Sequence, residues 1–406
     1  MADFHQNGNI ATIHNLRTRT TEDLTYELVS YSATRKISLI LPSLYSELEG
    51  EALPRILEEL SQVPYIHRIV IGLDRADEAQ YRHAREFFSV LPQNHVVIWN
   101  DSPRMKAIED RLETLGLAPS EPGKGKNVWG CIGFLLACAD SEVVAIHDCD
   151  IVTYDRDMLA RLLYPVVNPN FPYQVAKGYY ARVGHERING RVARMLVSPL
   201  LIAMKKVIGD RDYIDYLRAF RYPLSGEMAL RTAVLHNLRI PSDWGLEIGV
   251  LSEAWRNLAP KSVCQVEIAD HYDHKHQDLS AEDKSTGLSR MSIDICKAIF
   301  RKLAADGTVF NEEVFRTLKA TYYRAALDLL EAYYNDAVMN GLKVDRHTEE
   351  MTAELFAENI MEAGRVFLDN PSETPFIPTW SRVHAADSSL MTDMLKAVAA
   401  DLKDYG

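Results

Sequence analysis

Two aspartates near the middle of the chain have the spacing of ligands for one metal ion. The apolar run V-V-A-I at 143–146 is followed directly by His147-Asp148-Cys149-Asp150. A strand that ends just before Asp148 and Asp150 releases both carboxylates within reach of a single divalent cation bound to phosphate oxygens. Mg²⁺ and Mn²⁺ prefer such carboxylate and phosphate ligands. The alternative is that these aspartates only cap a turn, where aspartate is common.

Two further segments combine a basic side chain with glycine. Lys124 lies between two glycines in P-G-K-G-K at 122–126. Glycines allow the backbone to approach an anion, and the ammonium group supplies a point charge. Gly190 and Arg191 open an apolar helix, where free N–H groups and a guanidinium together favour phosphate or carboxylate. The alternatives are a solvated turn at 122–126 and an ordinary helix start at Arg191.

Histidines and acids complete the candidate residues. His271, His274 and His276 lie within six residues, a density that can complete a metal site, zinc included, or bind phosphate; a solvated loop is the alternative. Glu227 in P-L-S-G-E and Glu247 in G-L-E-I-G are flanked by glycines, as in the walls of a site, although Glu227 could begin a helix. The sequence has no G-x-S-x-G elbow, no Walker A loop and no G-x-G-x-x-G. These absences argue against a serine hydrolase, a P-loop protein and a dinucleotide-binding enzyme.

The elements that must position these residues alternate between strands and helices. Alternation at this spacing predicts βαβ units and a mostly parallel sheet covered on both faces, with ligands beyond the carboxyl ends of the strands. Farther along, a strand is predicted at 173–180 and a helix at 191–208, and from about residue 291 the pattern is helical. The first elements predicted are strands at 36–42, 68–74, 95–99 and 142–146, and helices at 49–63, 77–90 and 131–138.

Composition sets the class of protein. The 406 residues are 47% hydrophobic and 25% charged, with a formal net charge of -12, which is typical of a soluble protein and argues against a nucleic-acid binder. No apolar run is long enough to cross a membrane, and the first residues are polar. Five cysteines without a C-x-x-C pair favour reduced thiols and the cytoplasm. We expect an N-terminal extension at 1–35, an α/β domain at 36–290 and a helical C-terminal region at 291–406.

The order of the motifs resembles that of one enzyme family. The chain is similar to the retaining GT-A glycosyltransferases that make glucosyl-3-phosphoglycerate, and to their relatives, the mannosyl-3-phosphoglycerate synthases. The resemblance spans about residues 36–300 and implies a GT-A fold, an NDP-sugar donor, a 3-phosphoglycerate acceptor, Mg²⁺ or Mn²⁺, and a homodimer. The motifs that carry it are L-P-S-L at 41–44, G-K-G at 123–125, H-D-x-D at 147–150, G-R-V at 190–192, P-L-S-G-E at 223–227, G-L-E-I-G at 245–249 and a late histidine.

Roles for the donor and the metal follow from this resemblance. The nucleoside would lie against the residues that follow the first two strands, and the diphosphate would contact a lysine and the metal. The residues so implied are Pro42, Ser43, Leu44, Glu47 and Asp74 for the nucleoside, Lys124 for the diphosphate, and Asp148, Asp150 and His274 for the divalent ion.

The resemblance also implies an acceptor site and a mechanism. Because no carboxylate is evidently placed as a covalent nucleophile, it implies attack on the face that the diphosphate leaves, with that diphosphate taking the acceptor proton. Two departures bear on these roles: Ala193 replaces a hydroxyl residue that is common in the family, and Glu47 is one residue beyond its usual spacing. The implied residues are Gly190, Arg191 and His276 for the acceptor's phosphate or carboxylate, Glu247 for its hydroxyls, and Leu224, Ser225 and Gly226 facing the anomeric carbon.

Several alternatives remain open at this point. The motifs do not separate glucose from mannose, 3-phosphoglycerate from free glycerate, or one nucleotide base from another. Products of this family serve as compatible solutes or as precursors of larger glucosides. Other classes would be a sugar-nucleotide pyrophosphorylase, whose Gly-rich N-terminal loop is absent, or a non-catalytic nucleotide-sugar sensor. The apolar side chains of the tail favour either a homodimer or packing within the chain: Tyr322, Leu327, Leu330 and Tyr333.

Overall fold

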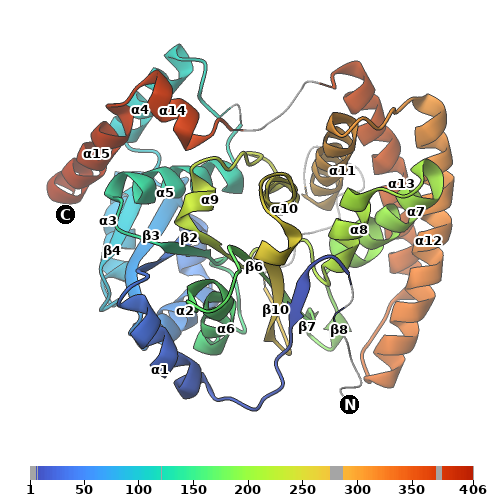
Figure 1. The fold of residues 1–406 in the computed structure, drawn as a ribbon, viewed down its shortest axis with the longest axis horizontal. Helices are drawn as coiled ribbons and strands as arrows, with labels where there is room; N and C mark the ends of the chain where they lie inside the picture. Colours follow the sequence, from blue (N-terminus) through green and yellow to red (C-terminus); the bar gives the residue numbers. More distant parts are fainter. Residues whose placement is uncertain (1–5, 7, 120, 275–286, 372–376, 406) are drawn as a thin grey trace.

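In this computed structural model a mixed sheet crosses the centre of the molecule (Figure 1). The structure describes residues 6, 8–119, 121–274, 287–371 and 377–405, and within them the sheet has eight strands. β9 is antiparallel to both of its neighbours, and all other pairs are parallel, which confirms the predicted fold class. The strands are, in spatial order, β1 (Ala11–Ile13), β10 (Val263–Ala269), β6 (Val175–Tyr180), β9 (Met228–Arg231), β5 (Val143–Ile146), β2 (Ile37–Leu44), β3 (Ile66–Asp74) and β4 (His95–Trp99).

Helices cover both faces of the sheet because successive strand residues point to opposite sides. In β2, Leu39 and Leu41 belong to one buried core and Ile40 to the other. The first core lies under α1 (Thr21–Ser32), α2 (Ala52–Ser61), α3 (Glu78–Phe88) and α6 (Arg156–Val167). The second lies under α4 (Pro103–Thr114), α5 (Lys124–Cys138), α7 (Ser198–Ile208), α8 (Asp212–Ala219) and α10 (Leu246–Asn257).

The strand predicted to end at Pro42 continues to Leu44. Pairing of β2 with β5 stops at Ile40, whereas pairing with β3 goes on to Leu44. Pro42, which has no N–H, therefore lies where one side of β2 has no neighbouring strand. The elements not predicted from the sequence include β1, β9, β10, α1, α4 and α6, and Glu227 precedes a strand rather than beginning a helix.

The predicted helical C-terminal part is present and packs at two ends of the sheet (Figure 1). One group lies against α7 and the other against α4 and α5. In the second group the ring of Trp380 stacks on that of Trp129 at a centroid distance of 4.2 Å. The first group is α11 (Gly287–Ala305), α12 (Glu312–Met339) and α13 (Arg346–Asp369), and the second is α14 (Trp380–Ala386) and α15 (Leu390–Asp404).

Two smaller features come directly before α7 in the chain. A two-stranded hairpin, β7 (Val183–Gly184) and β8 (Arg187–Ile188), leads into a π-helix at Val192–Val197 that continues directly as α7. The helix predicted at 191–208 is therefore present, but its first part is wound as a π-helix. None of the described helices has both the length and the apolar character needed to cross a membrane.

Candidate active site

A carboxylate pair and one histidine meet at the carboxyl end of β5. Asp148 and Asp150 follow this strand, and the loop that carries His274 is joined to them by an isolated bridge between His274 and Ile151. Single ligand atoms of the three side chains all lie within 4.8 Å of one another. Among the described residues, Asp150 Oδ1 and both ring nitrogens of His274 are buried without a hydrogen-bond partner. Buried polar atoms left in this way, on an acid and an imidazole beside a second acid, fit a divalent cation.

Lys124 connects this group to a second acid. It is the first residue of α5, and its Nζ lies 2.6 Å from Asp148 Oδ1 and 3.0 Å from Glu247 Oε1. Although burial lowers the pKa of Lys124, the charges of Asp148 and Glu247 raise it above its usual value. Lys124 also lowers the pKa of Asp148 against the raising effect of burial. Lys124 and Asp148 therefore form an ion pair, and Glu247 lies on the other side of the ammonium group.

The glycines beside Lys124 also approach the backbone of a neighbouring segment closely. A Cβ on Gly125 would collide with the Pro241 carbonyl oxygen, and one on Gly123 would meet that of Ser242. The glycines therefore allow α5 to begin against the 241–242 segment, which leads into α10 and Glu247. Their close approach is to protein backbone, and it brings Lys124 to Glu247.

The turn at Leu224–Gly226 packs directly on Asp148. Ser225 is fully buried, and a Cβ on Gly226 would collide with the Asp148 carboxylate. The Ser225 carbonyl accepts a hydrogen bond from the ammonium group of Lys177, a fully buried lysine in β6. Burial lowers the pKa of Lys177 to about 8. The buried Lys177 side chain therefore holds the backbone of the turn in place.

A buried carboxylate lies next to that turn. Glu227 accepts hydrogen bonds of 2.8 Å from the hydroxyl groups of Tyr180 and Tyr272, whose rings stack at 3.7 Å. Burial, and then the charge of Asp148, raise the pKa of Glu227. Tyr272 also packs edge-on against His274. The network therefore ties the turn to the histidine loop.

The residues implied for the nucleoside lie along the same edge of the sheet. Pro42, Ser43 and Leu44 are the last residues of β2, and Leu44 is paired in register with Asp74, the last residue of β3. Glu47 follows in a short 3₁₀-helix, Tyr45–Glu49. Burial raises the pKa of Asp74, which accepts a hydrogen bond of 2.7 Å from Asn100.

The residues implied for the acceptor lie near the turn. Gly190 has a φ of 74°, and a Cβ there would be 3.1 Å from the Tyr222 hydroxyl oxygen, two residues before Leu224. The half-buried Arg191 directly precedes the π-helix. A Cβ on Gly184 in the hairpin would collide with the Asp273 carboxylate, so the hairpin lies against the His274 loop. His276 falls outside the described residues.

The chain is similar in sequence to known proteins that share one name. No family model matches the chain. It is 43% identical over 404 residues, 100% of both chains, to the glucosyl-3-phosphoglycerate synthase of Persephonella marina. The chain belongs to the glucosyl-3-phosphoglycerate synthase family. The relative from Methanococcoides burtonii, of the same name, is 38% identical over 99% of both chains.

A solved structure from the same family has the same fold. The glucosyl-3-phosphoglycerate synthase of Mycobacterium tuberculosis, in complex with Mn²⁺, UDP-glucose and phosphoglyceric acid, superposes with a TM-score of 0.53 and 20% identity. The match covers 73% of this chain and 88% of that chain. The resemblance read from the motifs is confirmed at the level of family and fold.

For this family member, the site outlined above is more extensive than the motifs predicted. Lys177, Tyr180 and Tyr272 were not singled out from the sequence, although a lysine inside the apolar strand V-A-K-G-Y-Y is a signal that could have been used.

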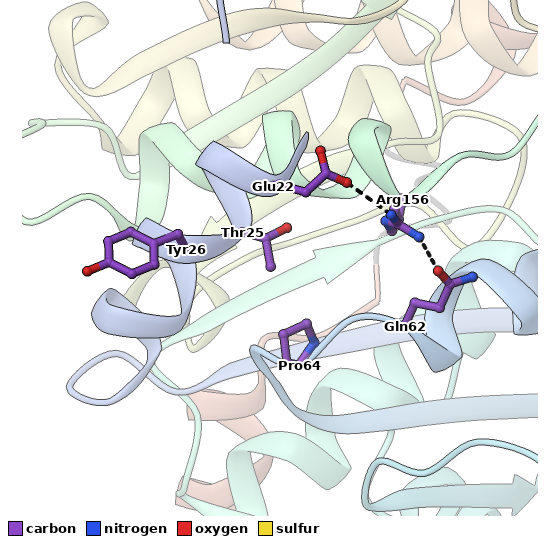
Figure 2. A pocket seen from close by; sticks show the side chains of 6 residues that line it. All are labelled: Glu22, Thr25, Tyr26, Gln62, Pro64 and Arg156. Carbon is purple, nitrogen blue, oxygen red and sulfur yellow. Dashed lines mark hydrogen bonds and ion pairs between the residues drawn. The ribbon is translucent and has the colours of Figure 1, made fainter. Parts of the chain in front are cut away.

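A separate pocket of about 360 Å³ is lined by none of the predicted residues. As Figure 2 shows, it is lined by Glu22, Thr25, Tyr26, Gln62, Pro64 and Arg156.

Proposed function

We propose that this protein transfers glucose from UDP-glucose to 3-phosphoglycerate and produces glucosyl-3-phosphoglycerate with retention of configuration at the anomeric carbon. The observation that carries the proposal is the full-length identity of 43% to a synthase of that name, in a chain that brings Lys124, Asp148, Asp150 and His274 together. The choice of UDP and glucose rests on the related structure from Mycobacterium tuberculosis, which is a complex with Mn²⁺, UDP-glucose and phosphoglyceric acid.

Each group in the cluster has a task in this reaction. When bound, a divalent cation at Asp148, Asp150 and His274 supplies positive charge opposite a developing diphosphate. Lys124 adds a second, preorganised positive charge, which is most effective where water is excluded. Glu247, which holds the Lys124 ammonium at 3.0 Å, also orients the acceptor hydroxyls. The nucleoside lies against the residues at or just after the ends of β2 and β3, which are Pro42, Ser43, Leu44, Glu47 and Asp74.

The acceptor meets the donor at the turn. Gly190 and Arg191 bind the carboxylate or phosphate of 3-phosphoglycerate, for which a guanidinium is suited. Leu224, Ser225 and Gly226 face the anomeric carbon. The acceptor oxygen forms its bond to that carbon on the face from which the diphosphate leaves. The bond to the diphosphate breaks, its electron pair stays on the diphosphate, and a diphosphate oxygen takes the hydroxyl proton.

A matrix of substrates tests the proposal. Purified protein with Mn²⁺ is given UDP-, ADP- or GDP-linked glucose or mannose, each with 3-phosphoglycerate or glycerate, and product mass is measured. We expect turnover with UDP-glucose and 3-phosphoglycerate that falls at least 100-fold in Asp150→Ala. Turnover only with mannose donors or only with free glycerate would overturn the stated substrates, and the latter would connect to Ala193. Donor binding without turnover in any well would favour a sensor.

We further propose a cytoplasmic homodimer. The five cysteines are all free thiols, which fits a reducing compartment. Of the apolar side chains in the tail, Tyr322 and Leu330 are buried within the chain, so a dimer contact would use the half-buried Leu327 and Tyr333. Light scattering on the eluting protein gives its mass directly, and a monomer at micromolar concentration would exclude the dimer.

A further inference from the structure

A buried arginine holds the segment that leads to Gly190 and Arg191. Arg194 is only 7% exposed, although arginine is rarely buried unless paired. Its Nε donates to the carbonyl oxygen of Asn189 at 2.9 Å, and one terminal nitrogen donates to that of Ile188 at 3.2 Å. The guanidinium therefore fixes the two residues just before Gly190.

The C-terminal helices hold this guanidinium in turn. Its terminal nitrogens lie 2.6 and 3.4 Å from the two carboxylate oxygens of Glu349 in α13. The carbon atom at its centre lies 4.8 Å from the centre of the Tyr333 ring in α12. A two-pronged pair of this kind fixes direction as well as distance, which a lysine cannot do.

Two more contacts join the same helices to the same segment. The Tyr322 hydroxyl of α12 donates to the Met195 carbonyl oxygen, inside the π-helix, at 2.5 Å. After α12, the backbone N–H of Lys343 donates to the Glu186 carbonyl oxygen in the hairpin at 2.7 Å, and the two side chains form an ion pair. The contacts thus lie on both sides of Gly190 and Arg191.

We propose that α12 and α13 are part of the acceptor site, and that Arg194, held by Glu349, is a positioning residue for Arg191. The proposal rests on the proposed function, because it takes Arg191 as the group that binds the anionic acceptor. Small displacements of a binding group are costly in rate and affinity. Losing the Arg194–Glu349 pair should therefore weaken acceptor binding and leave the donor, held by other segments, unaffected.

The test compares two ion pairs that join the C-terminal region to the rest of the chain. Glu349→Gln and Arg194→Lys disturb the pair at the acceptor segment. Arg104→Lys is the matched control, because Arg104 pairs at 2.6 Å with Asp401 of α15, at the other end of the sheet. For each variant, KM for 3-phosphoglycerate, KM for UDP-glucose, kcat and the melting temperature are measured.

We expect KM for 3-phosphoglycerate to rise at least tenfold in both variants, KM for UDP-glucose to stay within twofold, and the control to change neither. An unchanged acceptor KM, or equal rises in both KM values, would overturn the proposal. If either variant fails to fold, Tyr322→Phe, which removes only the hydroxyl bonded to Met195, gives the same comparison with a smaller expected rise. Absence of turnover in the unmodified protein would instead contradict the proposed function.

Discussion

At the scale of single residues, Gly226 sets how close the turn can come to a metal-binding carboxylate. A Cβ there would collide with Asp148. We therefore expect Gly226→Ala to turn the Asp148 side chain away from Asp150 and His274. Disturbing a group next to a metal ligand typically costs about 10–100-fold in metal affinity. Titration calorimetry with Mn²⁺ measures the change.

The control for this substitution is Gly130→Ala. A Cβ on Gly130, inside α5, would meet nothing within 4 Å, and alanine is favoured over glycine in a helix by roughly 0.5–1 kcal/mol. This variant should bind Mn²⁺ like the unmodified protein and be slightly more stable. Equal Mn²⁺ affinity in both variants would contradict the role given to Gly226.

Another residue-scale prediction concerns Asp243. Burial, and then the charge of Asp294, raise its pKa from 3.8 to about 6. Between about pH 4 and 6 the folded state therefore holds a proton that the unfolded state has lost, so the cost of a charged Asp243 is absent below this range and complete above it. Asp243→Asn keeps an oxygen for the Gly245 N–H, which donates at 2.8 Å.

We expect Asp243→Asn to be more stable than the unmodified protein by about 1–3 kcal/mol at pH 8, with the gain vanishing near pH 4. Urea unfolding at both pH values measures this difference. Asp210→Asn, at an aspartate whose side chain is 85% exposed, serves as the control and should show no such gain. A gain of equal size at pH 4 and pH 8 would rule out the ionisation of Asp243 as its source.

At the scale of elements, the strands that the sequence predicted are those whose residues are nearly all apolar and buried. β2, β3, β4 and β5 are of this kind, because parallel strands with helices on both faces read as continuous apolar runs. β6, which was also predicted, is buried throughout but contains Lys177. β9 has four residues, as β5 does, but one of them is the charged Arg231, so that it does not read as an apolar run. Its place between β5 and β6 depends on pairing across the sheet.

The residues of the site divide in the same way, into those that a local pattern reveals and those that only tertiary packing brings together. Lys124, Asp148 and Asp150 stood out locally because each lies in a short polar motif at the edge of an apolar element. Lys177 did not, because its partner, the Ser225 carbonyl, lies 48 residues farther along the chain. The same holds for Arg194 and Glu349, which are 155 residues apart. Contacts over such separations are set by tertiary packing, which no local pattern records.

α14 gives a prediction for Trp380, the side chain that packs this helix on α5. Trp380 is 2% exposed, and its ring fills the space above Gly133, where a Cβ would collide with it. Its indole N–H also donates to the Trp129 carbonyl oxygen at 2.9 Å. Trp380→Ala should lower the free energy of unfolding by about 3–5 kcal/mol, measured in urea. Trp244→Ala, at a tryptophan that is 40% exposed, should cost much less; similar losses would contradict the argument.

At the scale of the whole molecule, the candidate site exists only when distant parts of the chain are folded together. Lys124 comes from α5, the aspartates from the loop after β5, Glu247 from α10, and His274 from the loop after β10. An unfolded chain cannot present this set of groups to one ligand. A ligand that binds the set therefore binds only the native state and must stabilise it.

This linkage gives the last prediction. The Mn²⁺–UDP complex, at about 100 times its dissociation constant, should add about 2.7 kcal/mol to the free energy of unfolding and raise the melting temperature by a few degrees. Asp150→Ala should lose most of this rise, whereas Asp210→Ala, far more exposed, should keep it. Because the rise measures binding alone, it separates a lost metal site from a lost catalytic step. An equal rise in Asp150→Ala would mean that the ion and nucleotide bind elsewhere.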